Sequence, residues 1–177
     1  DDLKFNFEAF DKFLEQKPTV FFLPNPNQPV ESAFTTNELR EFAKKTLAKN
    51  CLFIIDEAYH MFGCESGIDL VKEFENVVVT RTFSKGFGVP SIRLGYLISN
   101  EANMSVLTKT RLAHESNSLT NAVAEYLIDN YENVVKVYND RVIASRDALK
   151  KTLHALDIST HGNNGNYLLL DLKTAER

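Results

Sequence analysis

A short run of β-branched residues that leads directly into a lysine and two glycines constrains this chain more than any other feature. Residues 77–80 read Val-Val-Val-Thr, which is typical of a strand buried on both faces of a sheet. Ser84, Lys85, two glycines and Arg93 follow in the loop over 82–93. Glycines let the backbone turn sharply beside a ligand, and ligands in open α/β sheets lie at the carboxyl ends of the strands. The pattern therefore predicts that Lys85 presents its amine at a ligand site.

A second strand pattern ends in a carboxylate. Residues 51–55, Cys-Leu-Phe-Ile-Ile, again have the composition of a buried strand, and Asp56, Glu57 and Tyr59 follow them. The carboxyl ends of neighbouring parallel strands lie at the same edge of a sheet. The Asp56 carboxylate and the Lys85 amine are therefore predicted to meet in one crevice.

Strand patterns alternate with helical patterns, which predicts an α/β fold with a mainly parallel sheet and helices on both faces. Thr35 and Glu38 have the spacing of a capping box at the start of one helix. The predicted strands cover residues 19–23, 51–55, 76–81, 94–99 and 167–170. The predicted helices cover residues 5–16, 35–49, 68–74, 104–114, 119–130 and 132–156. Apolar residues lie near one face of the last helix: Val135, Tyr138, Val142, Leu149, Leu153 and Leu156.

Composition limits the classes of function. Of the 177 residues, 44% are hydrophobic and 25% are charged, which suits one ordinary domain or one domain with the start of a second. A formal charge of −4 argues against a nucleic-acid surface, and no apolar run approaches the roughly 20 residues of a membrane-spanning helix. Cys51 and Cys64 are predicted to be reduced structural thiols, which favours a cytoplasmic location. The absence of a starting Met predicts a processed or cut piece.

Three phrases carry a resemblance to a known family. They are Asn25-Pro26-Asn27-Gln28-Pro29, Asp56-Glu57-Ala58-Tyr59, and Ser84-Lys85 with Arg93. In this order they resemble the large domain of fold-type I pyridoxal-phosphate (PLP) enzymes of the aminotransferase class I/II group, and the histidinol-phosphate aminotransferase-like branch looks most similar. The resemblance implies three parts: residues 1–131 in the PLP-binding large domain, 132–157 as a long connecting helix, and 158–177 as the beginning of a small C-terminal domain.

The resemblance gives three residues a direct part in the chemistry. Lys85 would bind the aldehyde of PLP covalently through its amine, and the released amine would move the α-proton of the substrate. Asp56 would face the pyridine nitrogen and keep it protonated, because an ion pair favours both charged forms. Tyr59 would hydrogen-bond the phenolic oxygen of the ring.

Four further residues would hold the cofactor. Arg93 would grip the phosphate as a fork of donors, with the hydroxyls of Ser84 and Thr82 beside it. Gln28 stands where the family's phrase has an Asn that touches the ring oxygen, and Val and Glu follow Pro29 where the family has Thr and Gly. Gln carries the same amide on a longer stem, so the contact is expected with altered geometry. The family's cis bond would correspond to Gln28–Pro29.

The implied function is transfer of an amino group between an amino acid or amino phosphate ester and a 2-oxo acid. PLP is the expected cofactor, the donor and acceptor are the expected partners, and a homodimer is expected for the full-length protein. Other cofactor and substrate groups of the family lie outside this chain, so the chain alone is expected to be inactive. A PLP-dependent decarboxylase of a phosphorylated amino acid is the alternative within the superfamily.

Alternatives from other classes remain open. Residues 52–57 also resemble the Walker B strand of P-loop ATPases, but a Gly-x-x-x-x-Gly-Lys loop is lacking. The four histidines and Cys64 lack the spacing of a metal site, which favours surface or loop roles. A non-catalytic module that keeps the fold for subunit contacts is the third alternative.

Overall fold

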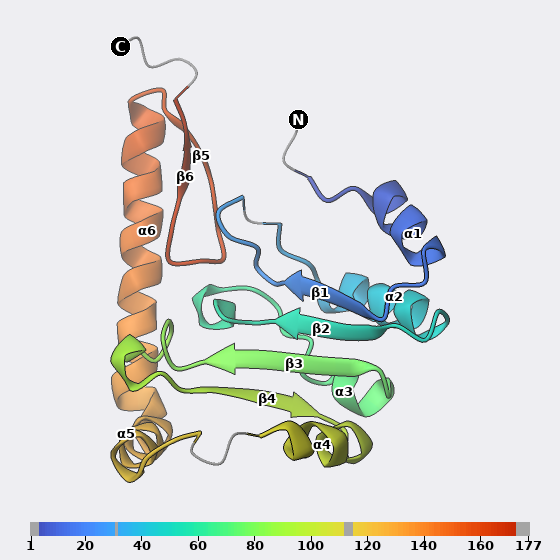
Figure 1. Ribbon diagram of the computed structural model, residues 1–177. Coiled ribbons are helices and arrows are strands. Elements are labelled where there is room, and N and C mark those ends of the chain that lie inside the picture. Colours follow the sequence, from blue (N-terminus) through green and yellow to red (C-terminus); the bar gives the residue numbers. More distant parts are fainter. Residues whose placement is uncertain (1–3, 31, 112–114, 173–177) are drawn as a thin grey trace.

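The computed structural model describes residues 4–30, 32–111 and 115–172. A four-stranded sheet in the order β1-β2-β3-β4 forms its centre (Figure 1). Strands β1 (Val20–Pro24), β2 (Leu52–Asp56) and β3 (Val77–Thr82) are parallel, and β4 (Gly95–Ser99) runs antiparallel to β3. The predicted α/β class and mainly parallel sheet are confirmed.

The helices follow the predicted alternation. They are α1 (Phe7–Glu15), α2 (Thr36–Leu47), α3 (Leu70–Glu73), α4 (Glu101–Leu107), α5 (Ser118–Asp129) and α6 (Val137–Ala155). Short 3₁₀ turns are η1 (His60–Phe62), η2 (Pro90–Ile92) and η3 (Thr108–Thr110), and a π-helical turn, η4 (Tyr131–Lys136), leads into α6. In Figure 1, α6 passes along the edge of the sheet where the three parallel strands end.

Helix α2 shows how local sequence and packing agree. The Thr35 hydroxyl accepts a hydrogen bond from the Glu38 amide, and the Glu38 carboxylate accepts one from the Thr35 amide, which completes the predicted capping box. Leu39, Phe42 and Ala43 then recur at helical spacing and are buried against the sheet. The cap and the apolar face therefore specify the same helix.

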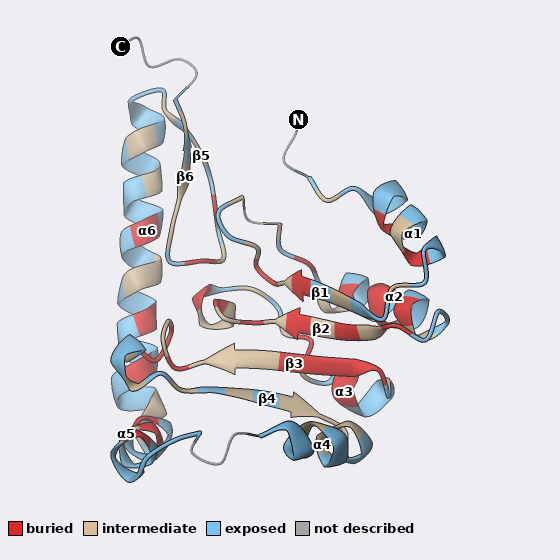
Figure 2. Ribbon diagram, in the orientation of Figure 1, coloured by how far each residue is buried: buried red, intermediate tan, exposed pale blue. Residues whose placement is uncertain are grey.

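A cluster of aromatic rings around Phe42 forms the main core. Figure 2 shows the buried residues concentrated on β2, β3 and the helices that pack on them. The Phe42 ring is 2% exposed and lies 4.9 Å from the Phe10 ring and 5.2 Å from the Phe34 ring. One side chain thus joins α1, α2 and the loop before α2.

Replacing Phe42 by alanine is expected to lower the free energy of unfolding by about 3–5 kcal/mol, because the buried ring leaves a cavity. Phe42→Leu keeps most of the volume and is expected to cost less than half as much. Denaturant unfolding of both variants measures the difference. Equal losses for the two variants would show that the ring does not fill a tightly packed site.

One predicted helix has clearly different bounds in the structure. The helix predicted for 104–114 begins earlier, at Glu101, because the Asn100 side chain accepts a hydrogen bond from Asn103 N and caps it there. It ends at Leu107 and continues only as the turn η3. The end of the predicted helix, at residues 112–114, lies outside the described residues.

The apolar face predicted for the long helix is only partly buried: Val135 is buried, whereas Tyr138 is 49% exposed. Leu149 and Leu156 are 53% and 65% exposed, whereas Asn139 and Arg146 are buried. The Arg146 guanidinium donates hydrogen bonds from NH1 to Phe62 O at 3.0 Å and Gly165 O at 2.9 Å. Polar contacts to two distant segments thus hold this helix in place. The spacing of apolar residues in the sequence does not predict these contacts.

A hairpin follows α6. Strands β5 (Ser159–His161) and β6 (Leu169–Asp171) pair antiparallel, and Figure 1 shows them beside α6 and away from the main sheet. The strand predicted for 167–170 corresponds to β6. Strand β5 was not predicted, because three residues, Ser-Thr-His, give neither an apolar run nor a readable alternation.

Candidate active site

The loop after β3 fixes the backbone of Lys85. Phe83 N donates to Leu94 O at 3.0 Å, and Gly88 N donates to Lys85 O at 2.9 Å, which closes a turn around the lysine. The Phe83 and Phe87 rings on either side of Lys85 are buried and stack 4.3 Å apart. The aromatic pair anchors the loop, and the half-buried Lys85 side chain projects from it.

Lys85, Tyr59 and Gln28 come together from three separate segments. Lys85 Nζ lies 5.3 Å from the centre of the Tyr59 ring. The Tyr59 hydroxyl donates a hydrogen bond to Gln28 Oε1 at 2.9 Å. Lys85, Tyr59 and Gln28 are thus neighbours. The resemblance assigns Lys85 to the aldehyde of PLP, and Tyr59 and Gln28 to its phenolic oxygen. The Gln28–Pro29 bond is cis, as predicted, and Asn25–Pro26 is also cis.

Asp56 occupies the last position of β2, beside β3. Its Cα partner on β3 is Thr80, and since strand side chains alternate, Asp56, Thr80 and Thr82 lie on the same face. Asp56 Oδ1 accepts a hydrogen bond from Ala58 N at 3.0 Å, which fixes the carboxylate at the strand end. The half-buried carboxylate therefore lies at the carboxyl-terminal ends of the parallel strands, where the Lys85 loop also begins.

The predicted phosphate-binding residues are less closely grouped. The Thr82 hydroxyl donates to Leu94 O at 3.4 Å and accepts from Ser84 N at 3.1 Å, so it shapes the lysine loop. Arg93 has a left-handed backbone, with φ of 51°, and donates from NH1 to Pro90 O at 3.2 Å. Its side chain lines a cavity of about 580 Å³ with residues of β3 and β4, and Asp56 and Lys85 do not line that cavity.

Tyr167 is a neighbour of the site that sequence reasoning did not single out. Its ring lies edge-on to the Tyr59 ring at 5.2 Å, and its hydroxyl donates to Asn27 O at 2.8 Å. It thereby joins the segment before β6 to both the Asn-Pro loop and Tyr59. The sequence places Tyr167 far along the chain, and only the course of α6 brings it back.

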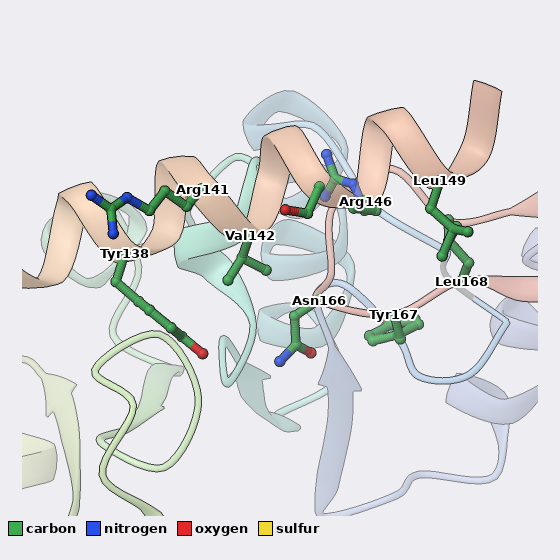
Figure 3. Close-up of a pocket in the computed structure, with 9 residues that line it drawn as sticks. Tyr138, Arg141, Val142, Arg146, Leu149, Asn166, Tyr167 and Leu168 are labelled. Atoms are coloured by element: carbon green, nitrogen blue, oxygen red, sulfur yellow. The ribbon is translucent and has the colours of Figure 1, made fainter. Parts of the chain in front are cut away.

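A cavity of about 530 Å³ lies between α6 and the segment that holds Tyr167. Figure 3 shows Tyr138 and Val142 extending from α6, with Asn166 and Tyr167 on the facing segment. An ideal Cβ on Gly88 of the lysine loop would lie 3.9 Å from the Tyr138 ring. The walls of this cavity therefore contact the lysine loop at one end and Tyr59 at the other.

Gly86 permits close contact between the lysine loop and the turn after Tyr59. A Cβ at this position would overlap Met61 Sδ and lie 2.7 Å from Met61 Cβ. Met61 in turn accepts a weak hydrogen bond from Asn139 on α6. The glycine next to Lys85 is therefore required by packing against Met61.

Gly86→Ala is expected to destabilise the protein by about 1–3 kcal/mol, because the new methyl group overlaps Met61 and displaces the lysine loop. Thermal unfolding measures the loss. Ser91→Ala, which removes an exposed hydroxyl from the same loop, is the control and should change stability by less than about 0.5 kcal/mol. A Gly86→Ala variant as stable as the control would contradict the close contact.

Electrostatics beside the site depend on burial. Burial lowers the pKa of His60, and the nearby Arg81 charge lowers it further, so the imidazole favours its neutral form. At the opposite end of β2 from Asp56, burial raises the pKa of the Cys51 thiol. In the described ranges, no group of three His, Cys, Asp or Glu side chains is arranged to hold a metal ion. None of the described helices is long and apolar enough to cross a membrane.

The α/β fold with its mostly parallel four-stranded sheet matches the large domain of PLP-dependent transferases. The family model for aminotransferase class I and II matches residues 1–177. The chain therefore belongs to the class I and II aminotransferase family, whose enzymes use PLP.

Individual relatives agree with this assignment. The histidinol-phosphate aminotransferase of Thermotoga neapolitana is 32% identical over 89% of this chain and 46% of its own length. A dihydroxyacetone phosphate transaminase of Campylobacter jejuni is 31% identical over 93% of this chain and 44% of its own length. This chain thus spans about half the length of the curated relatives it matches.

Solved structures confirm the fold. Histidinol-phosphate aminotransferase from Sinorhizobium meliloti, in complex with pyridoxal-5'-phosphate, superposes with a TM-score of 0.81 and 22% identity over 98% of this chain and 48% of its own. L-threonine-O-3-phosphate decarboxylase from Porphyromonas gingivalis superposes with a TM-score of 0.68 and 21% sequence identity. The match covers 83% of this chain and 47% of the decarboxylase chain. The fold is thus common to proteins with different reactions.

Proposed function

We propose that this chain is the cofactor-domain part of a PLP-dependent aminotransferase that moves an amino group between an amino acid or amino phosphate ester and a 2-oxo acid. The observation that carries the proposal is the contact series from Lys85 through Tyr59 to Gln28, at the sheet edge that also bears Asp56. PLP, when bound, supplies the electron sink that carbanion chemistry at an amino acid requires.

The side chains present fit such a ring. Asp56 uses Oδ1 to accept from Ala58 N, and in the described part of the chain Oδ2 has no hydrogen bond, so it can accept one from a pyridine N–H. The Tyr59 hydroxyl donates its proton to Gln28 Oε1, which leaves the Gln28 amide N–H groups as the donors that this pair can offer to a phenolic oxygen. The ring would therefore lie between Asp56 on one side and the Tyr59–Gln28 pair on the other.

Lys85 would perform the covalent and proton-transfer steps. Among the described residues its amine makes no ion pair, and it lies 5.3 Å from the centre of the Tyr59 ring, so it is available to an aldehyde. After an amino substrate has displaced it, the same amine can take the proton from the substrate α-carbon. Arg93 would anchor the phosphate with its remaining donors, and Ser84 and Thr82 would support it from the loop.

The family assignment and the structure disfavour the ATPase reading. A Walker B glutamate must reach a water molecule, whereas the Glu57 side chain is fully buried and ion-paired with Arg81. Decarboxylation of a phosphorylated amino acid stays the alternative, because substrate orientation selects the reaction on this fold. We also propose that the full-length protein is a homodimer. Within this chain we propose a PLP-binding large domain over 1–131, a connecting helix over 132–157 and the beginning of a small domain over 158–177.

The test uses the full-length protein with PLP. Absorbance spectra should show the band of lysine-linked PLP, and incubation with amino donors and 2-oxo acids should yield a new amino acid and a new 2-oxo acid. Release of carbon dioxide from the donor, without amino transfer, would instead support the decarboxylase. Failure to take up PLP would overturn both and favour the non-catalytic module.

A further inference from the structure

A buried ion pair connects the ends of the two strands that lead to Asp56 and Lys85. The Glu57 side chain is fully buried and that of Arg81 is 14% exposed. Arg81 donates from Nε and NH2 to Glu57 Oε2, at 3.0 Å and 2.9 Å. Glu57 directly follows Asp56, and Arg81 lies four residues before Lys85.

The hydrogen-bond sites of the Glu57 carboxylate are filled. Gly67 N donates to Oε1 at 2.6 Å, and the Ser66 hydroxyl lies 2.9 Å from Oε1 and 3.0 Å from Oε2. Arg81 NH2 also donates to Ser66 Oγ at 2.9 Å. The Glu57 backbone adds a third tie to β3, because its N–H donates to Thr80 O at 2.9 Å. Backbone and side chain of Glu57 are thus both held to β3.

Stability alone is a weak reason for such a pair. Removing two charges from water costs several kcal/mol per ion, and well-packed apolar residues of similar volume are often as stable or more stable. Apolar residues do not reproduce one property of the pair, which is the fixed orientation of one side chain relative to the other. The planar guanidinium of Arg81 allows few orientations relative to the carboxylate of Glu57.

The fixed orientation of Glu57 relative to Arg81 bears on the candidate site, which lies on the opposite face of the sheet. Alternation along β2 and β3 places Glu57 and Arg81 on the face opposite Asp56 and Thr82. We propose that the Glu57–Arg81 pair is a positioning device, which sets the separation of the Asp56 carboxylate and the Lys85 amine so that both reach one PLP ring. The inference rests on the proposed function, and the pair would act without touching the cofactor, because it lies on the face opposite Asp56.

The test replaces the pair by apolar residues of similar volume, Glu57→Leu/Arg81→Met, in the full-length protein. We expect the melting temperature to fall, because the buried Gly67 N–H loses its acceptor on Glu57, and the protein to remain folded. The dissociation constant for PLP, from absorbance titration, should rise about tenfold or more. The pH midpoint of the lysine-linked PLP band should also move, because it reports the groups around that nitrogen. A purely structural pair would leave that midpoint unchanged.

The control is the Arg40–Glu73 pair, which also uses Nε and NH2, at 2.7 Å and 3.0 Å, but donates to two separate carboxylate oxygens, is more exposed and joins α2 to α3. Arg40→Met/Glu73→Leu should leave PLP affinity and the pH midpoint unchanged. If the Glu57/Arg81 double variant does not fold, Glu57→Gln, which keeps the side-chain volume, is measured in the same way with the same expectation.

The outcomes separate the two proposals. A wild type that forms the PLP band, with a pair variant whose affinity and midpoint equal the wild type's, would overturn the positioning role alone. Equal effects from the control pair would overturn it as well. A wild type that forms no band would overturn the proposed function and the inference together.

Discussion

Replacing Lys85 by alanine is expected to abolish covalent uptake of PLP by the full-length protein and to slow amino transfer by roughly 10⁴-fold or more. Alanine offers no amine for the aldehyde and no base for the substrate α-proton. The structure supports this residue because its amine lies 5.3 Å from the Tyr59 ring and makes no ion pair among the described residues. Absorbance spectra and an amino-transfer assay measure the two losses.

Lys109→Ala is the matched control for that experiment. Lys109 is exposed, and it lies in the turn η3 after α4, outside the lysine loop. Its replacement should change neither the PLP band nor the rate. A Lys85→Ala protein that keeps the band would contradict the assignment of Lys85.

Asp56→Asn is expected to slow amino transfer by about 10²–10³-fold and to weaken PLP binding. The side chain keeps its oxygen for the Ala58 amide, so the fold at the end of β2 should persist. Asparagine carries no charge, and it no longer stabilises a proton on the pyridine nitrogen, so the ring becomes a poorer electron sink. Steady-state rates and a PLP titration measure the two effects.

Asp69→Asn tests whether loss of any carboxylate has this effect. The Asp69 side chain is 77% exposed and pairs with Lys72 within a short helical segment. It should behave as the wild type does. An Asp56→Asn protein with the wild-type rate would place the pyridine nitrogen away from β2.

The sequence predicts the sheet well because its strands carry their own signals. The runs before Asp56 and through 77–80 are apolar and β-branched, and both form central strands of the sheet. The Thr35 capping box also forms as predicted. These signals are local, because each strand or helix cap is specified by its own residues and needs no knowledge of distant parts of the chain.

Non-local contacts set the limit of sequence reasoning. A glutamate at the end of β2 reads as a polar residue of the loop, and its buried partner Arg81 is found only once β3 lies beside β2. Arg146 reads as a surface residue of a long helix, yet its guanidinium binds the carbonyls of two distant loops. Tyr167 reaches Tyr59 by the same long-range course of the chain.

The proposed roles of individual residues have unequal structural support. Lys85, Tyr59 and Gln28 form one contact series, and Asp56 lies on the neighbouring strand end. Arg93 instead lines a cavity that they do not share. Its role as phosphate anchor therefore predicts that its side chain turns toward the lysine loop when the phosphate binds.

Chemical trapping tests the central claim most directly. The full-length protein is mixed with PLP, reduced with sodium borohydride to make the lysine link permanent, digested and mapped by mass spectrometry. The proposed site predicts a phosphopyridoxyl group on Lys85 and on no other lysine of this chain. A label on a different lysine, or no label at all, would contradict it.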